Sequence, residues 1–311
     1  MLVSLLATVT LSAAHGAVHS PAQTASPAAA SAADRAPAVS PSRSTPLSRD
    51  TRGRPIIAAT INGQGAYAMV LDTAAQTSLV TAPLARDLGL PALGQQMSIA
   101  GASGQVQADL YGVDRFSTDL FDAEGVALLA LPNAGATEAR GIVGMEMFAG
   151  GRLTFDPAAH AVTYQPSDAP AEGYAVVKGR LDETGLLVVP VEIDGVAFDA
   201  LVDTGAAVSV ASGGALKALG WGPNDPRLKP AGAITGAGRQ ETLVQSGHVG
   251  LVRLGPVNFR DLNLVFTPDV PAEKAAETAP KPTLILGSDL LGALDAFALD
   301  FPKAELLIRV P

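Results

Sequence analysis

An internal repeat constrains the fold of this 311-residue chain more than any other feature. The first half contains AMVLDTAAQTSLV, then the glycine-containing run SIAGASGQ, then GIVGMEMFAGGRLTFD. The second half contains FDALVDTGAAVSV, AITGAGRQ and LILGSDLLGALDAFALDF in the same order. Asp72 and Asp203 occupy matching places, 203 − 72 = 131 positions apart. The repeat predicts two homologous lobes, each with an aspartate inside an apolar run.

Within each half the pattern is typical of β-strands. Short alternating runs, such as RPIIAATINGQGAYAMVLD, are separated by turn residues, as at Asn62-Gly63 and Asp156-Pro157. Helical patterning is brief, as in TAPLARDLGL and GALKALGW. We therefore predict an all-β fold with short helices. The expected N-terminal lobe spans residues 54–165, the linker 166–173 and the C-terminal lobe 174–311.

The N-terminal region has a different composition. The chain begins with an apolar run that ends in small residues, MLVSLLATVTLSAAHGA. This pattern predicts a signal peptide over residues 1–17. Export through cleavage is the favoured interpretation, giving a periplasmic or secreted protein, and retention of the segment as an anchor is the alternative. No other segment is apolar enough to span a membrane. Residues 18–52, rich in Ala, Ser and Pro, cannot bury a core and predict a disordered tether.

Composition removes several kinds of chemistry. The chain has no cysteine, and His15 and His19 fall in the leader. His160 is expected in a turn and His248 in an exposed connection, so neither a histidine-based triad nor a zinc site is predicted. A net charge of -9 without a basic block argues against nucleic acid as a partner. We expect no metal and no cofactor, so carboxylates should carry any hydrolytic chemistry.

Two pairs of motifs resemble those of a known family. LVDTGA followed by LILGSDLL resembles the active-site strand and hydrophobic-glycine motif of retropepsin-like aspartic proteases, and VLDTAA followed by GIVGMEMF resembles the same pair. The resemblance covers nearly all of residues 54–311. It implies two β-barrel lobes with the active site at their interface, on one chain as in pepsin-like members. A monomer is therefore expected.

The resemblance also implies the chemistry. Asp72 and Asp203 would be a catalytic pair that hydrolyses peptide bonds of a polypeptide substrate. Two adjacent carboxylates cannot both ionise easily, so they share one proton. The ionised one can activate water while the protonated one polarises the scissile carbonyl.

Supporting roles follow from the same resemblance. Thr73 and Thr204 would hydrogen-bond across the lobe junction; simple β-branched strand residues are the alternative. Mobile flaps would close over substrate at two glycine hairpins, the alternative being ordinary turns. The flap residues are Gly101, Ala102, Ser103 and Gly104 in the first lobe and Gly236, Ala237 and Gly238 in the second. Neither tip carries an aromatic residue, and Tyr111 lies beyond the first hairpin.

One position departs from the family pattern. Ala74 stands where Gly205 stands in the second copy, and its methyl group disfavours positive φ and crowds the loop. A catalytically inactive peptide-binding or scaffold protein is therefore the main alternative to an endopeptidase. A carboxylate-dependent glycosidase is a weaker alternative. Carbohydrate sites usually present aromatic side chains, and the chain is only 5% aromatic with the single Trp221.

Other acids have structural interpretations. Asp199 is expected on the solvent side of its strand. Glu146 and Asp289 are expected in the first turn of short helices, where the helix dipole favours an acid. Ala75 and Ala206 stand where pepsin-like members tend to carry a hydroxyl that would stabilise the charged carboxylate. We therefore expect an acidic pH optimum that is milder than that of pepsin.

Overall fold

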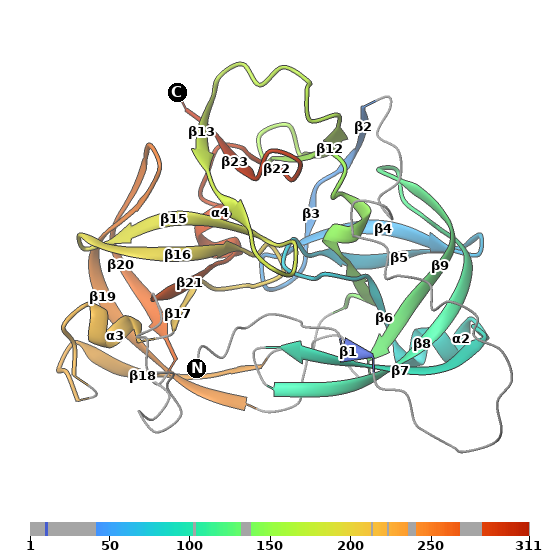
Figure 1. Ribbon diagram of the computed structural model, residues 1–311, viewed down its shortest axis with the longest axis horizontal. Coiled ribbons are helices and arrows are strands. Elements are labelled where there is room, and N and C mark those ends of the chain that lie inside the picture. The colour runs from blue at the N-terminus through green and yellow to red at the C-terminus, as the bar shows by residue number, and fades with distance from the viewer. Residues whose placement is uncertain are drawn as a thin grey trace, which may run out of the picture.

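A computed structural model describes residues 10–11, 42–101, 104–131, 138–212, 214–222, 224–235, 241–267 and 282–310. Within these residues the strands form three sheets, two large ones and a smaller one (Figure 1). Helices are short, which confirms the predicted all-β class. In the part of the chain described here, no helix has the length and apolarity needed to cross a membrane.

The first large sheet belongs to the N-terminal half. Its strands, in spatial order, are β1 (Thr10–Leu11), β7 (Ala92–Gly101), β8 (Gly104–Ser117), β9 (Asp122–Leu131), β6 (Leu79–Thr81), β10 (Gly141–Val143), β5 (Gln64–Leu71), β4 (Pro55–Ile61) and β3 (Ser48–Arg49). An additional pairing between β4 and β8 closes six of these strands into a barrel.

The second large sheet repeats this order in the C-terminal half. Its strands are β18 (Leu228–Thr235), β19 (Glu241–Leu254), β20 (Val257–Phe266), β17 (Val210–Ser212), β21 (Thr283–Leu286), β16 (Val196–Val202), β15 (Leu187–Ile193) and β14 (Arg180–Leu181). The pairing of β15 with β19 matches that of β4 with β8. Each strand from β7 to β3 therefore has a counterpart, so the two predicted homologous lobes are confirmed.

Alternation of apolar residues explains why these segments become barrel strands. In β4 the burial of successive side chains alternates, with Ile57, Ala59 and Ile61 inside the barrel. The turn between β4 and β5 uses Asn62 and Gly63, both with positive φ, as a two-residue hairpin requires. Most buried apolar side chains of both lobes join one continuous core, and a smaller separate cluster lies in the first lobe.

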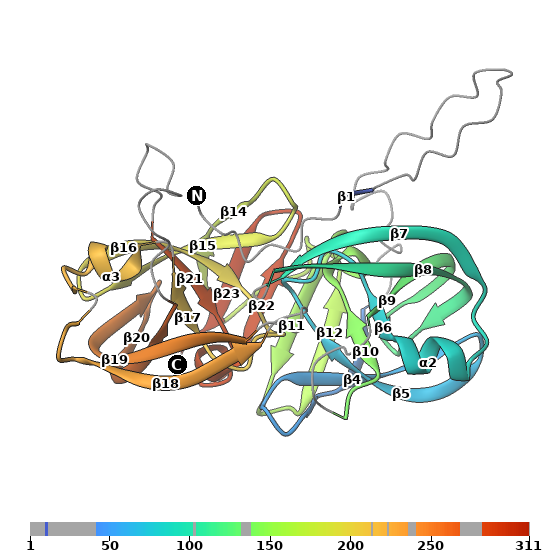
Figure 2. The ribbon, with the colours of Figure 1, turned by 90° about the horizontal axis from the view of Figure 1, so that it is seen from below.

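The smaller sheet connects the lobes. Its strand order is β13 (Tyr174–Lys178), β23 (Glu305–Arg309), β22 (Phe297–Asp300), β11 (Arg152–Asp156), β12 (Ala161–Gln165) and β2 (Arg43–Pro46). Figure 2 shows β22 and β11 between the two lobes. These two strands pair antiparallel, and the rings of Phe155 and Phe297 stack there with centroids 4.7 Å apart. In Figure 1 this sheet lies at the opposite side of the molecule from β7 and β18.

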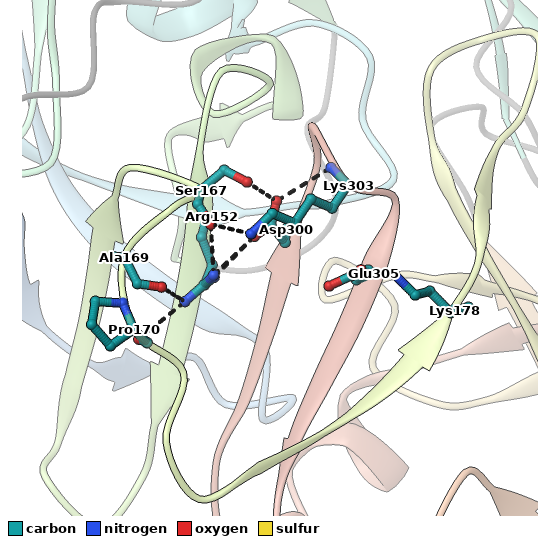
Figure 3. A network of polar contacts seen from close by, with 8 residues as sticks. All are labelled: Arg152, Ser167, Ala169, Pro170, Lys178, Asp300, Lys303 and Glu305. Carbon is teal, nitrogen blue, oxygen red and sulfur yellow. Dashed lines mark hydrogen bonds and ion pairs between the residues drawn. The ribbon is translucent and has the colours of Figure 1, made fainter.

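A buried polar network also crosses this sheet (Figure 3). The guanidinium of Arg152 on β11 donates to the carboxylate of Asp300 on β22, with Nη2 3.0 Å from Oδ2, and both side chains are buried. Arg152 also donates to the carbonyl oxygens of Ser167, Ala169 and Pro170 in the linker. Ser167 in turn donates its hydroxyl to Asp300. The network ties both lobes and the connecting segment together.

The short helices lie near their predicted places. They are α2 (Ala82–Asp87), the 3₁₀ helix η1 (Met145–Met147), α3 (Ala215–Ala218) and α4 (Ser288–Leu291). Thr81 caps α2 by accepting from the backbone N–H of Leu84. His160 lies in the turn between β11 and β12, as predicted.

Two expectations about order and connections are wrong. The disordered tether was predicted to reach residue 52, but β2 and β3 lie at 43–46 and 48–49. These strands form because β12 and β4 supply the pairing partners, which the composition of the segment does not reveal. His248 lies within β19 rather than in a connection, although its side chain is exposed.

Candidate active site

The two aspartates lie at equivalent strand ends. Asp72 follows β5, and its backbone N–H donates to the carbonyl of Val143 at 3.0 Å. Asp203 follows β16, and its N–H donates to the carbonyl of Leu286 at 3.0 Å. In both lobes the neighbouring strand, β10 or β21, runs parallel to the aspartate strand. Each aspartate therefore stands at the carboxyl end of a buried pair of strands.

The structure brings the two carboxyl groups together, since they hydrogen-bond to each other. The N–H of Ala74 donates to Oδ1 of Asp72 at 2.9 Å, and the N–H of Ala206 donates to Oδ1 of Asp203 at 2.8 Å. Both residues keep part of their surface accessible to solvent. The pair is thus held by backbone donors but still open to a bound molecule.

The surroundings raise the pKa of both acids. Removal from water raises the pKa of Asp203 well above its usual range, and the nearby charge of Asp72 raises it further. Removal from water also raises the pKa of Asp72, but the Ala74 N–H and the Arg54 charge oppose this rise. A pair with these properties holds one proton over a range of pH in which isolated aspartates have lost theirs.

Thr73 and Thr204 join the two loops by reciprocal hydrogen bonds. The N–H of Thr73 donates to Oγ1 of Thr204, and the N–H of Thr204 donates to Oγ1 of Thr73, both at 3.1 Å. Each hydroxyl also donates across the junction, from Thr73 to the carbonyl of Val202 and from Thr204 to that of Leu71. Both threonines are buried, so these contacts fix the relative position of the aspartates.

The triad positions Ala74 and Gly205 are not interchangeable. A Cβ built on Gly205 would lie 2.2 Å from Cγ of Asp72, a distance that carbon atoms cannot share without movement of the backbone or the carboxyl group. Ala74 carries a methyl group at the matching place in the first loop. The two carboxyl groups therefore cannot sit symmetrically with respect to the two loops.

Glu146 and Asp289 lie in the first turns of η1 and α4, as predicted, but their carboxylates bind the aspartate loops. Glu146 accepts from the N–H of Ser78, whereas Asp289 accepts from both the N–H and the hydroxyl of Ser209. Each serine also accepts from the glycine before its helix. Our interpretation of these acids as dipole-stabilising residues therefore missed their main contacts.

Ser78 and Ser209 were not identified from the sequence. Each lies six residues after its aspartate, in DTAAQTS and DTGAAVS, so the repeat itself contains the signal. Asp199, by contrast, forms a partly exposed ion pair with Arg180 and takes no part in the contacts of Asp72 and Asp203 described here.

The hairpins predicted as flaps are only partly described. Gly101 and Gly104 pair at the end of the β7–β8 hairpin. Ala102 and Ser103, at its tip, lie outside the described residues, as do Gly236, Ala237 and Gly238. The second hairpin is described as far as the pairing of Thr235 with Glu241. The flap role stays a prediction.

Two homologous barrels, each presenting an aspartate loop to the other across a threonine-bonded junction, define a two-lobed retropepsin-like architecture. A family model described as aspartyl protease matches residues 57–147 and 189–290, one segment in each lobe. This chain belongs to the aspartyl protease family. A search of curated proteins found no match. Within the described residues, no cluster of three or more histidine or acidic side chains could hold a metal ion.

Proposed function

We propose that this protein is an aspartic endopeptidase that hydrolyses polypeptide substrates between its two lobes. One observation carries the proposal: Asp72 and Asp203, far apart in sequence, hydrogen-bond to each other while remaining partly accessible. Membership of the aspartyl protease family supports the same reaction class.

The reaction needs one ionised and one protonated carboxyl group. The ionised group removes a proton from a water molecule, whose oxygen attacks the scissile carbonyl carbon. The protonated group donates its proton to the carbonyl oxygen, giving a tetrahedral diol. The diol then collapses: one of its hydroxyl groups returns its proton to the carboxylate that had donated one, the C–N bond breaks, and the amine leaves with the proton that the other carboxyl group had taken from water. Proton balance is restored without a covalent enzyme intermediate.

The second candidate is a peptide-binding protein that has lost turnover. Ala74 is the specific observation that favours it, since the matching position in the second loop has no room for a methyl group. In this alternative the cleft would bind extended peptides, but the displaced pair would not activate water.

Cleavage of an unbiased peptide library by the purified protein, with and without pepstatin, between pH 3 and 7, separates the two candidates. We expect pepstatin-sensitive cleavage that Asp72→Asn and Asp203→Asn each reduce by about 10²–10⁴-fold, with the double variant hardly worse. Asp199→Asn, on the strand that leads to Asp203, is the matched control and should cleave normally. Peptide binding without cleavage would favour the scaffold, and full activity of Asp72→Asn would exclude the two-lobed pair.

We further propose that the protein acts after export, in the periplasm or outside the cell. The apolar run at residues 1–17 and the Ala/Ser/Pro-rich segment after it support this location. Fractionation of producing cells, followed by N-terminal sequencing of the exported form, tests it. Recovery of the intact chain only from the cytoplasm would contradict the proposal.

A further inference from the structure

The residues that stand opposite the two aspartates differ in charge. In the antiparallel pair of β4 and β5, Ile56 is opposite Val70. The same register, continued two residues outward, places Arg54 opposite Asp72, at the cross-strand separation where side chains interact. The positive charge of Arg54 acts on Asp72, which agrees with this placement.

Arg54 is held in place by a buried partner. Its guanidinium donates to the carboxylate of Asp50, with Nε 2.8 Å and Nη2 2.7 Å from Oδ2. The Asp50 side chain is 0% exposed and that of Arg54 10% exposed. Oδ1 of Asp50 accepts from the N–H groups of Arg52 and Arg54, which closes a tight turn before β4. The cation is thus fixed beside Asp72 rather than free to point into solvent.

The second lobe has the same turn but no cation. In the pair of β15 and β16, Val188 is opposite Leu201, so Leu186 stands opposite Asp203. Oδ1 of Asp182 accepts from the N–H groups of Thr184 and Leu186, as Asp50 does in the first lobe. Leu186 is fully buried. One aspartate therefore faces a guanidinium and the other an aliphatic side chain.

We propose that Arg54 is a positioning residue that fixes the single negative charge of the pair on Asp72. This inference rests on the proposed function and assigns its two roles. Asp72 is the base that removes the proton from water, and Asp203 carries the proton that is donated to the substrate carbonyl. The higher pKa of Asp203, which burial and the charge of Asp72 produce, agrees with this assignment.

The other charged groups around Asp72 do not provide the same asymmetry. Asp203 faces Asp72 from the opposite loop, and a charge on either acid acts equally on the other. Glu146, on η1, is bound to the N–H of Ser78 and has Asp289 as its counterpart in the second lobe. Asp50 lies behind Arg54 and has Asp182 as its counterpart. Among these groups in the described residues, Arg54 is the one whose counterpart is uncharged.

The pH profile of kcat/KM tests the proposal. Arg54→Leu places in the first lobe the residue that the second lobe carries, but it leaves the buried Asp50 without its cation, so Asp50→Asn/Arg54→Leu is measured beside it. The acidic limb of the profile should move to higher pH by about one unit, because an ionised carboxylate loses a nearby positive charge. Arg54→Lys keeps the charge and should restore the wild-type limb. Arg115→Leu, which removes an exposed guanidinium paired with Asp122, is the matched control and should leave the profile unchanged. If the folded Arg54→Leu protein has the wild-type acidic limb, the proposal is wrong.

A second measurement does not depend on turnover. NMR titration of protein labelled with ¹³C at the aspartate carboxyl carbons, assigned through Asp72→Asn and Asp203→Asn, gives the order of ionisation. In the wild type Asp72 should ionise at lower pH than Asp203, and Arg54→Leu should narrow that gap. Should Arg54→Leu misfold, Asp50→Asn/Arg54→Leu removes both buried charges and gives the same comparison. Earlier ionisation of Asp203 would overturn the inference. An absence of cleavage with the expected titration order would count against the endopeptidase alone.

Discussion

At the scale of single residues, the central feature is that two acids are kept where water is scarce. Backbone donors from Ala74 and Ala206 offset part of the cost of burial, but the pKa of each acid stays raised. The mutual hydrogen bond lowers the pKa of Asp72 and raises that of Asp203. A carboxyl group with a raised pKa in the folded state destabilises that state once it must ionise. The site therefore opposes the stability of the fold that holds it.

This opposition predicts the effect of Asp203→Asn on stability. The folded-state pKa of Asp203 lies above its unfolded value, so its contribution is fully present below the unfolded pKa. That contribution is lost as the pH rises through the folded pKa, at no more than about 1.4 kcal/mol per pH unit. Asp203→Asn has no such loss, so its stability relative to wild type should increase from pH 4 to pH 7. Urea unfolding at both pH values measures this.

The control is Asp122→Asn at an exposed ion pair. The hydrogen bond from Arg115 lowers the pKa of Asp122 and outweighs the opposing effect of burial, so the change of stability with pH has the opposite sign. This variant should gain nothing at the higher pH. A relative stability of Asp203→Asn that falls toward pH 7 would contradict the raised pKa.

The repeat made it possible to predict Asp72, Asp203 and the threonines beside them from sequence. Arg54 could not be found in this way, because its importance depends on which residue lies across the strand pair. A shift of one position in the register would have turned it away from Asp72. Such pairing depends on tertiary contacts that a single sequence does not display.

At the scale of elements, the two aspartate loops follow equivalent strand ends, and the threonine contacts between the loops hold them together. The hydroxyl of Thr204 accepts from the N–H of Thr73 and donates to the carbonyl of Leu71, all within a buried junction. Hairpins and helices were predictable because their signals are local. Strand β2 was not, because it depends on the distant β12.

We expect Thr204→Val to destabilise the protein strongly despite its similar shape. The substitution leaves buried polar groups without their partner, at a cost of about 1–3 kcal/mol for each group left unsatisfied. Thr204→Ser keeps the hydroxyl and should lose about 1 kcal/mol for the missing methyl group. Chemical denaturation of both variants at one pH makes the comparison. Equal stability of the two would show that the hydroxyl contributes little.

At the scale of the whole molecule, the lobes are joined by a sheet to which both contribute strands. Arg152 and Asp300 form an ion pair at its centre, and carbonyl oxygens of the linker accept the other hydrogen bonds of the guanidinium. The motifs that resemble the family do not include this pair, so it could not be predicted from them. Its position follows from the antiparallel register of β11 and β22, in which the two residues are directly opposite.

Removing one member of this pair should cost more than removing both. Asp300→Leu leaves a buried guanidinium without its carboxylate, which typically costs about 3–5 kcal/mol. Arg152→Met/Asp300→Leu buries no unpaired charge and should be more stable than either single variant. A double-mutant cycle measured by urea unfolding gives the interaction energy. Strictly additive losses would mean that the two charges are not coupled.

The difference between Arg54 and Leu186 has a consequence for how this protein can change over generations. In a symmetric homodimer one gene encodes both subunits, so any substitution appears beside both acids at once. Here each acid has its own stretch of gene, and a mutation at position 54 leaves the surroundings of the other loop as they were. Natural variation, or a deliberate library at 54 and 186, can therefore change the residue opposite Asp72 and the residue opposite Asp203 one at a time.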